Sequence, residues 1–192
     1  MAKQTSARVL GVLVLFVVSA ATGISGCAST AEPAPSENTA APTSPTVSDD
    51  EALALIGETY AAFVTVIDDV LAHGGRDSQR LQSVATGSAL SDAESDAREF
   101  MSSGFHSAGK TKVNNLILQN STGATGASSP ELLAYVCEDV SDIDLFDENG
   151  ESLVSPERKT TQAFEIAVSD DNADGRYLVN SRRTWQGDGV CI

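Results

Sequence analysis

The hydrophobic pattern of this chain changes period at Gly104, from the three-to-four-residue spacing of helices to the two-residue alternation of strands. Before this point, apolar residues recur between positions 52 and 71 at the spacing of one buried helical face. Ser48 and Glu51 stand just before that run and predict a capping box at the helix start. Gly74-Gly75 predicts the helix end, because glycine readily takes the positive φ angle of a C-terminal cap.

Two shorter helices are expected before the period changes. Asp77 is placed to cap the first, and Gly87 to break it. Ser91 and Glu94 form a second potential capping box, which would open a helix running to about Ser102.

After Gly104, four short runs rich in β-branched and apolar residues are separated by polar turn segments. The runs are 113–119, 132–140, 162–168 and 177–185. In the third run, large apolar residues alternate with Ala163, Glu165 and Ala167, as expected of a strand with one solvent-facing side. The pattern predicts an α+β fold, with three N-terminal helices packed on a curved antiparallel sheet of about four or more strands.

The first 27 residues have the layout of a secretory signal peptide. A basic start with Lys3 and Arg8 is followed by an apolar run over 9–18, which is too short to span a bilayer as a permanent helix. The closing Ile24-Ser25-Gly26-Cys27 resembles the lipobox of bacterial lipoproteins, in which the peptide is cut before a lipid-bearing cysteine. The resemblance implies a signal peptide over 1–26 and a lipidated Cys27.

Residues 27–47 lack the apolar surface needed to fold. Pro, Ala, Ser and Thr dominate, and no large apolar side chain comes before Val47, so we expect a disordered tether. The folded domain is expected over 48–192. A lipid on Cys27 would hold this domain at the outer face of the cytoplasmic membrane, in an extracytoplasmic location.

The charge of the chain bears on its partners. The leader carries two of the 12 Lys and Arg and none of the 27 Asp and Glu, so the remainder has a formal charge of about 10 − 27 = −17. Nucleic acid is not an expected partner, because binding to phosphate depends on clustered Lys and Arg.

Three cysteines are present. If Cys27 carries the lipid, Cys137 and Cys191 form an even pair in a compartment that permits disulfides, and we predict a bridge between them. The alternative is two separate buried thiols.

One long helix, two shorter ones and an antiparallel meander over residues 49–192 resemble the cone-shaped (cystatin-like) domain of the nuclear transport factor 2-like superfamily. Members include isomerases, dehydratases, cargo binders and secreted actinobacterial lipoproteins. The resemblance implies a cone whose interior, in the enzymes, places a carboxylate or a histidine for proton transfer. Richness in Ala, Val, Asp and Gly also suits an actinobacterium.

Aromatic side chains are the first choice for the core and for a cavity inside the cone. The expected core residues are Tyr60, Phe63, Phe100, Phe164 and Trp185. The cavity candidates are Tyr60, His106 and Trp185, with a surface or core role as the alternative for His106.

Charged pairs give no recognisable catalytic set. Of Asp68-Asp69 and of Glu138-Asp139, at most one member each is expected to face inward. Arg182 and Arg183 are neighbours on one strand, so they should point to opposite faces. The acidic segment 170–175 resembles the start of a calcium loop, but Ser181 stands where a bidentate carboxylate is needed, so we expect a turn, no metal and no cofactor.

Two functions follow from these observations. The first is a non-catalytic binding or interaction module at the cell envelope, for an envelope protein, a polymer or a small ligand. The second is an enzyme of the isomerase or dehydratase kind, or a small-molecule carrier, that uses the cone interior. A pocket that holds a buried carboxylate or histidine would support this second function, and a solid apolar core would exclude it. Pairing of two copies is left open.

Overall fold

A computed structural model describes residues 48–120, 131–170 and 175–192 of the chain. These residues belong to one compact unit. The expected lipobox at Cys27, the expected tether and most of the acidic segment at 170–175 lie outside the described residues. No helix within the described ranges is long and apolar enough to cross a membrane.

Helix α1 (Asp49–Ala72) begins at the predicted capping box. Ser48 Oγ accepts the backbone N–H of Glu51 at 3.3 Å, and Glu51 Oε2 accepts the backbone N–H of Ser48 at 3.0 Å. The helix ends at Gly74-Gly75, also as predicted, and both glycines have positive φ. At Gly75 an added Cβ would lie 1.9 Å from the carbonyl oxygen of Ala97, so only glycine fits there.

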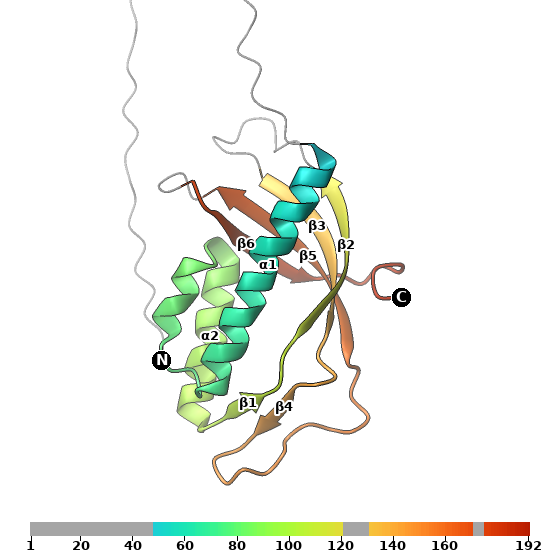
Figure 1. Cartoon of the computed structure of the whole chain (residues 1–192). Helices are drawn as coiled ribbons and strands as arrows, with labels where there is room; N and C mark the ends of the chain where they lie inside the picture. Colours follow the sequence, from blue (N-terminus) through green and yellow to red (C-terminus); the bar gives the residue numbers. More distant parts are fainter. Residues whose placement is uncertain (1–47, 121–130, 171–174) are drawn as a thin grey trace, which may run out of the picture. The chain divides into compact units, whose positions relative to one another are not determined.

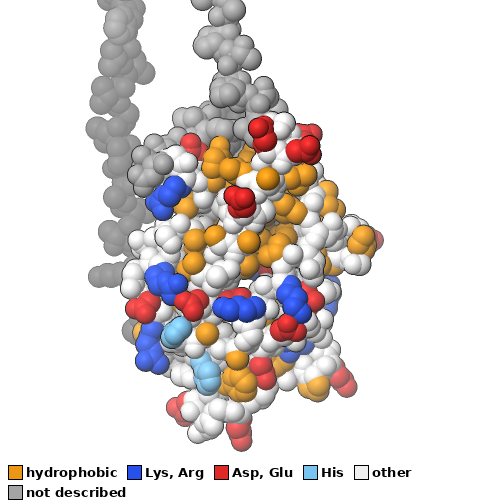
Figure 2. Space-filling model, viewed as in Figure 1, with side chains coloured by type: hydrophobic (Ala, Val, Ile, Leu, Met, Phe, Trp, Pro, Cys, Tyr) orange, Lys and Arg blue, Asp and Glu red, His pale blue; other side chains and the backbone are white. Residues whose placement is uncertain are grey.

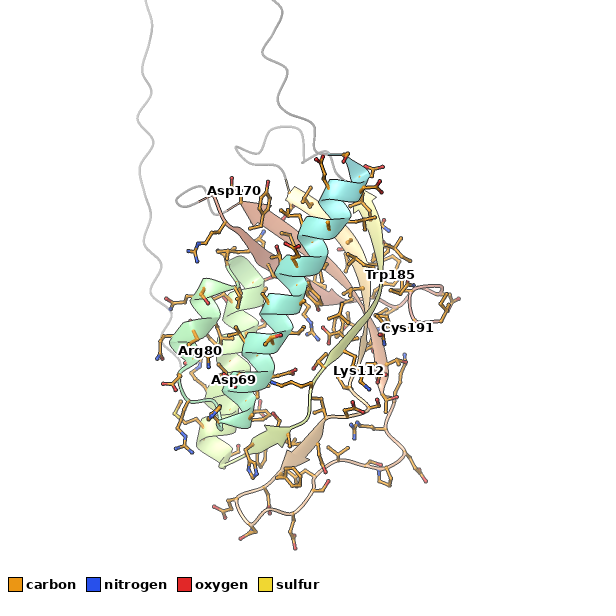
Figure 3. All side chains as sticks on the ribbon, viewed as in Figure 1. Asp69, Arg80, Lys112, Asp170, Trp185 and Cys191 are labelled. Carbon is orange, nitrogen blue, oxygen red and sulfur yellow. A yellow bond between two sulfur atoms is a disulfide. The ribbon has the colours of Figure 1, made fainter. Side chains whose placement is uncertain are left out.

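The second expected helix is a short 3-10 helix, η1 (Ser78–Ser83). Asp77 precedes it in the left-handed region, with a φ of 60°, and its side chain does not cap the helix, contrary to the prediction. Arg80 of η1 instead forms an ion pair with Asp69 of α1 (Figure 3), which fastens the two helices together.

The third helix, α2 (Gly87–Ser103), has its N-cap at Thr86, five residues before the predicted cap at Ser91. Ser91 lies inside it and donates its hydroxyl to the carbonyl of Gly87 at 3.1 Å, so the prediction of a capping box at Ser91 was wrong. Contact with the sheet sets the start: the backbone N–H of Thr86 donates to the carbonyl of Val179 at 2.9 Å. The helix ends at Gly104 in the left-handed conformation.

Four antiparallel strands form the main sheet, in the order β2-β3-β5-β6. Their bounds are close to the predicted runs: β2 (Lys112–Asn120), β3 (Glu131–Asp139), β5 (Thr161–Asp170) and β6 (Tyr177–Thr184). Two further strands, β1 (His106–Ala108) and β4 (Asp144–Phe146), pair in a small second sheet that was not predicted. With three residues each, they are too short to show an alternating pattern.

Helices α1 and α2 cover one face of the main sheet (Figure 1), which confirms the α+β fold class. The core lies between them, and it includes the predicted Tyr60, Phe63 and Phe164. Phe100 is only partly buried and packs edge-on against Phe105, with ring centres 6.2 Å apart. Trp185 does not join this core.

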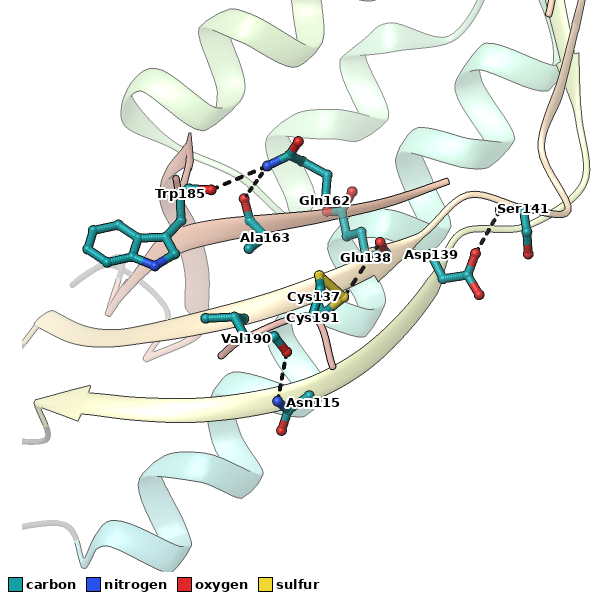
Figure 4. Close-up of a disulfide and its surroundings, with 10 residues drawn as sticks. All are labelled: Asn115, Cys137, Glu138, Asp139, Ser141, Gln162, Ala163, Trp185, Val190 and Cys191. Atoms are coloured by element: carbon teal, nitrogen blue, oxygen red, sulfur yellow. Dashed lines mark hydrogen bonds between the residues drawn. A yellow bond between two sulfur atoms is a disulfide. The ribbon is translucent and has the colours of Figure 1, made fainter. Parts of the chain in front are cut away.

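The other face of the sheet is partly covered by the C-terminal segment. Cys137 and Cys191 form the predicted disulfide (Figure 4), and Asn115 Nδ2 donates to the carbonyl of Val190 at 2.7 Å. Ala163 packs with Cys137 and Val190 and is 7% exposed. Ala167 on the same face is 2% exposed, so the expectation of a solvent-facing side on β5 was wrong.

Candidate functional site: a cavity between the helices and the sheet

A cavity of about 290 Å³ lies where α1, α2 and β3 meet the small second sheet. Its walls are mostly apolar. The apolar lining residues are Phe63, Val64, Ile67, Leu71, Phe100, Val140, Ile143 and Leu145. The charged lining residues are Asp68, Asp96, Glu138 and Arg182. A concave apolar space with a few polar groups has the composition of a small-molecule site.

Glu138 and Arg182 form the charged floor of the cavity. Arg182 Nε donates to Glu138 Oε1 at 2.9 Å, and Arg182 Nη2 donates to Oε2 at 2.6 Å. Tyr60 forms hydrogen bonds with both members of this pair. Its hydroxyl donates to Glu138 Oε1 and accepts from Arg182 Nε at 3.0 Å. The guanidinium also stacks on Phe164, 3.5 Å above the ring centre.

Strand alternation places Glu138 inside. Leu132, Ala134 and Val136 face the core on β3, and Glu138 continues the same face with 4% exposure. This agrees with the prediction that at most one member of the Glu138-Asp139 pair faces inward.

A bulge in β6 decides which arginine faces the cavity. Val179 pairs with Val168 and Ser181 with Ala167, so Asn180 is one extra residue on β6. This extra residue puts Val179 and Arg182 on the same face although they are three positions apart.

Arg183 points to the opposite face, where it forms an ion pair with Glu165. The predicted separation of Arg182 and Arg183 is thus confirmed. The bulge is held by Asn180 Nδ2, which donates to Glu131 Oε1 at 3.0 Å.

The surroundings keep Tyr60 and Arg182 protonated. Burial, followed by the negative charge of Glu138, raises the pKa of Tyr60 well above its ordinary value, so the hydroxyl keeps its proton. Burial alone would lower the pKa of Arg182. The hydrogen bond from Arg182 to Glu138 and the negative charge of Glu138 have the larger effect, so the pKa of the arginine is raised. Both groups therefore act as fixed hydrogen-bond donors.

Asp68 is a second buried carboxylate, 6% exposed, on the α1 wall of the cavity. Its two oxygens accept from the backbone N–H and the hydroxyl of Thr111, each at 2.8 Å. Its neighbour Asp69 turns outward to Arg80, so again one member of the adjacent pair faces inward.

Asp96 lies on α2 at the edge of the cavity and of a smaller recess of about 40 Å³ that Arg182 also lines. Partial burial raises the pKa of the Asp96 carboxyl above its ordinary value. Arg182 opposes this shift, while Glu99 and Asp92 add to it.

The three cavity candidates chosen from the sequence lie in different places. Tyr60 lies beneath the cavity floor, but His106 and Trp185 lie outside the cavity. His106 is exposed on β1, stacked on Phe146 with ring centres 5.3 Å apart. It lines an open surface groove of about 810 Å³ together with His73, and Figure 2 shows the two histidines (pale blue) near each other on the surface.

Trp185 lies on the face of the sheet that the helices do not cover, near Cys191 (Figure 3). Its ring stacks on Tyr135, with ring centres 4.3 Å apart. Gly187 packs closely on the indole, since an added Cβ would lie 2.4 Å from Nε1. Trp185 therefore contributes to the packing around the disulfide and not to the cavity.

Among the residues that the structure describes, no group of three or more His, Cys, Asp or Glu side chains could hold a metal ion. The domain belongs to the α+β class and has a partly open cavity whose floor is the ion pair of Glu138 and Arg182. No family model and no curated protein matches the chain. Among solved structures, the intermembrane space region of chloroplast protein ARC6 matches with a TM-score of 0.49 and 13% identity. That match covers 70% of this chain and 97% of the other.

Proposed function

We propose that this protein is a lipid-anchored extracytoplasmic binding protein whose domain takes up a small molecule in the cavity between α1, α2 and β3. The observation that carries the proposal is the cavity of about 290 Å³, which combines apolar walls with the paired charges of Glu138 and Arg182. Apolar walls supply affinity for an organic ligand, and a few fixed polar groups orient it.

The chemistry of the floor favours binding over proton transfer. A general acid or base has to exchange its proton near the working pH. Tyr60 and Arg182 both hold their protons firmly, and both oxygens of Glu138 already accept hydrogen bonds. We therefore favour a carrier or sensor of small molecules over the isomerase or dehydratase alternative.

The anchor rests on the sequence of the leader. The lipobox ending at Cys27 supports export and lipidation, and the Pro-rich segment after it supports a tether between membrane and domain. Two acyl chains on Cys27 would hold the protein stably, whereas one chain holds a protein only marginally. We also propose membership of the nuclear transport factor 2-like superfamily, on the order of elements read from the sequence.

Titration with the neutral apolar fluorophore N-phenyl-1-naphthylamine tests the use of the cavity. We expect saturable binding with one molecule per chain. Leu71→Phe, which adds bulk to the cavity wall, should weaken that binding about tenfold or more. Ile117→Phe is the matched control, because Ile117 is 37% exposed and does not line the cavity. Absence of saturable binding, or equal binding by both variants, would refute the proposal.

A further inference from the structure

The charges that line the cavity do not balance. Three carboxylates, those of Asp68, Asp96 and Glu138, face one guanidinium, that of Arg182. Arg182 is already engaged by both oxygens of Glu138, so this pair is close to neutral as a unit. The net negative charge of the cavity therefore comes from the carboxylates of Asp68 and Asp96.

Asp68 is the deeper of these two carboxylates. It is 6% exposed, and its hydrogen bonds come from neutral donors of Thr111. Within the described part of the chain, no Lys, Arg or His forms an ion pair with it. A positive charge brought into the cavity would therefore be attracted to a carboxylate that has no positive side chain of the described residues within ion-pair distance.

Asp96 adds to the same preference from the α2 side. It lines the cavity together with Asp68, so a ligand cation would be attracted by both carboxylates. Burial raises the pKa of the Asp96 carboxyl, and a cation beside it would stabilise the charged form. An anionic ligand would meet the opposite situation, because the single arginine of the cavity is already paired.

Two aromatic rings in the cavity wall also favour a cationic ligand. Phe63 of α1 and Phe100 of α2 both line the cavity. A ring face attracts an ammonium group, and the attraction is stronger where water is excluded. Carboxylates and phenyl rings together are suited to an organic ammonium group, while the aliphatic wall formed by Ile67, Leu71 and Ile143 is suited to an apolar body.

We propose that the cavity binds a cationic amphiphile: a molecule with one protonated amine, held by Asp68 and Asp96, and an apolar body packed on the wall between α1 and β4. This inference rests on the proposed function and narrows it to one class of ligand. The cavity volume limits the bound part of such a molecule to about 290 Å³.

Three probes of equal chain length test the inference by calorimetry on the mature domain at pH 7 and 150 mM salt: n-octylamine, n-octanol and octanoate. We expect the Kd of octylamine to be at least about tenfold lower than that of octanol, with octanoate the weakest. The salt screens general attraction between the amine and a strongly acidic protein.

Substitutions of the two aspartates test whether their carboxylates bind the amine. Asp96→Asn and Asp68→Asn should each raise the Kd of octylamine, by about threefold and about tenfold respectively, and leave the Kd of octanol unchanged. Glu58→Gln is the control, because it removes an exposed carboxylate of α1 that does not line the cavity. Should Asp68→Asn fail to fold, Asp96→Asn at its exposed position still decides the matter.

Each outcome separates this inference from the function on which it rests. Octanol or octanoate binding as tightly as octylamine would overturn the cationic ligand and leave the cavity as a binding site. An unchanged Kd for octylamine in Asp96→Asn and in a folded Asp68→Asn would overturn it too. If none of the three probes binds, both the cationic ligand and the proposed function fail.

Discussion

Glu138 and Arg182 stand 44 residues apart in the chain, and two hydrogen bonds join their side chains beneath the cavity. They lie on β3 and β6, two strands that are not neighbours, because β5 runs between them. Arg182 crosses this gap by lying over the ring of Phe164 on β5. The ion pair therefore links three strands and also forms the floor of the candidate site.

Glu138→Gln should destabilise the domain. The substitution removes the charge that Arg182 and Tyr60 were arranged around, and leaves a guanidinium that is only 32% exposed without its partner. Breaking a buried pair in this way costs about 3 kcal/mol, the lower end of the usual range because Arg182 keeps some contact with solvent. Urea unfolding measures the change.

The control for this variant is Glu165→Gln, on the other face of the same sheet. Glu165 pairs with Arg183, whose side chain is 71% exposed, so its loss should change the unfolding free energy by less than about 1 kcal/mol. Equal losses for the two variants would contradict a special role for the buried pair.

Most of the fold could be predicted from the sequence, because the signals are local. The Ser48 capping box, the apolar face of α1 and the four long strands depend on residues within a few positions of one another. The start of α2 could not be predicted, since it depends on a hydrogen bond between Thr86 and Val179, which lie on distant parts of the chain.

Asp96→Asn should make the domain more stable at neutral pH. A carboxyl whose pKa is raised on folding binds its proton more tightly in the folded state. The folded state is therefore favoured at low pH, and this advantage is lost as the pH rises through the folded pKa.

Asparagine has no carboxyl group to titrate, so the stability of the Asp96→Asn variant is not lowered in this way as the pH rises. Its melting temperature should exceed that of the parent at pH 7. The difference should shrink as the pH falls through the raised folded pKa of Asp96, and it should be gone once the pH is below the ordinary value of 3.8. Melting curves at several pH values measure this, with Glu58→Gln as the comparison. A difference that does not depend on pH would mean that the effect is not the titration of Asp96.

Removing the disulfide with Cys137→Ala and Cys191→Ala should cost roughly 4 kcal/mol of unfolding free energy. The bond closes a loop of 54 residues, and opening the loop restores the conformational entropy of the unfolded chain. Urea unfolding with and without reductant should show the same loss in the parent and no effect of reductant in the double variant. Two free thiols in the unreduced parent, detected by mass spectrometry, would contradict the bridge.

Cys27→Ser tests the proposed anchor. Without the thiol that we propose as the lipid acceptor, the protein should either be released from the membrane or keep its leader uncleaved. Fractionation and intact mass of the expressed protein distinguish these states from the lipidated parent. Normal processing together with membrane retention would overturn the lipobox assignment.

The candidate site was harder to predict than the fold. Alternation along β3 was a usable signal for Glu138, because Leu132, Ala134 and Val136 already mark the inward face. No comparable signal existed for Arg182, since a bulge at Asn180 changes the alternation of β6. Asp68 and Asp96 come together only through the packing of α1 and α2.

The bulge at Asn180 determines which of the two adjacent arginines faces the helices. If β6 paired without the extra residue, Arg182 would move opposite Glu165 and Arg183 would take the inward position on the Phe164 side. Each face of the sheet would still have one guanidinium and one glutamate. Removal of one residue at the bulge would therefore exchange the two arginines between the faces of the sheet and still leave one on each face.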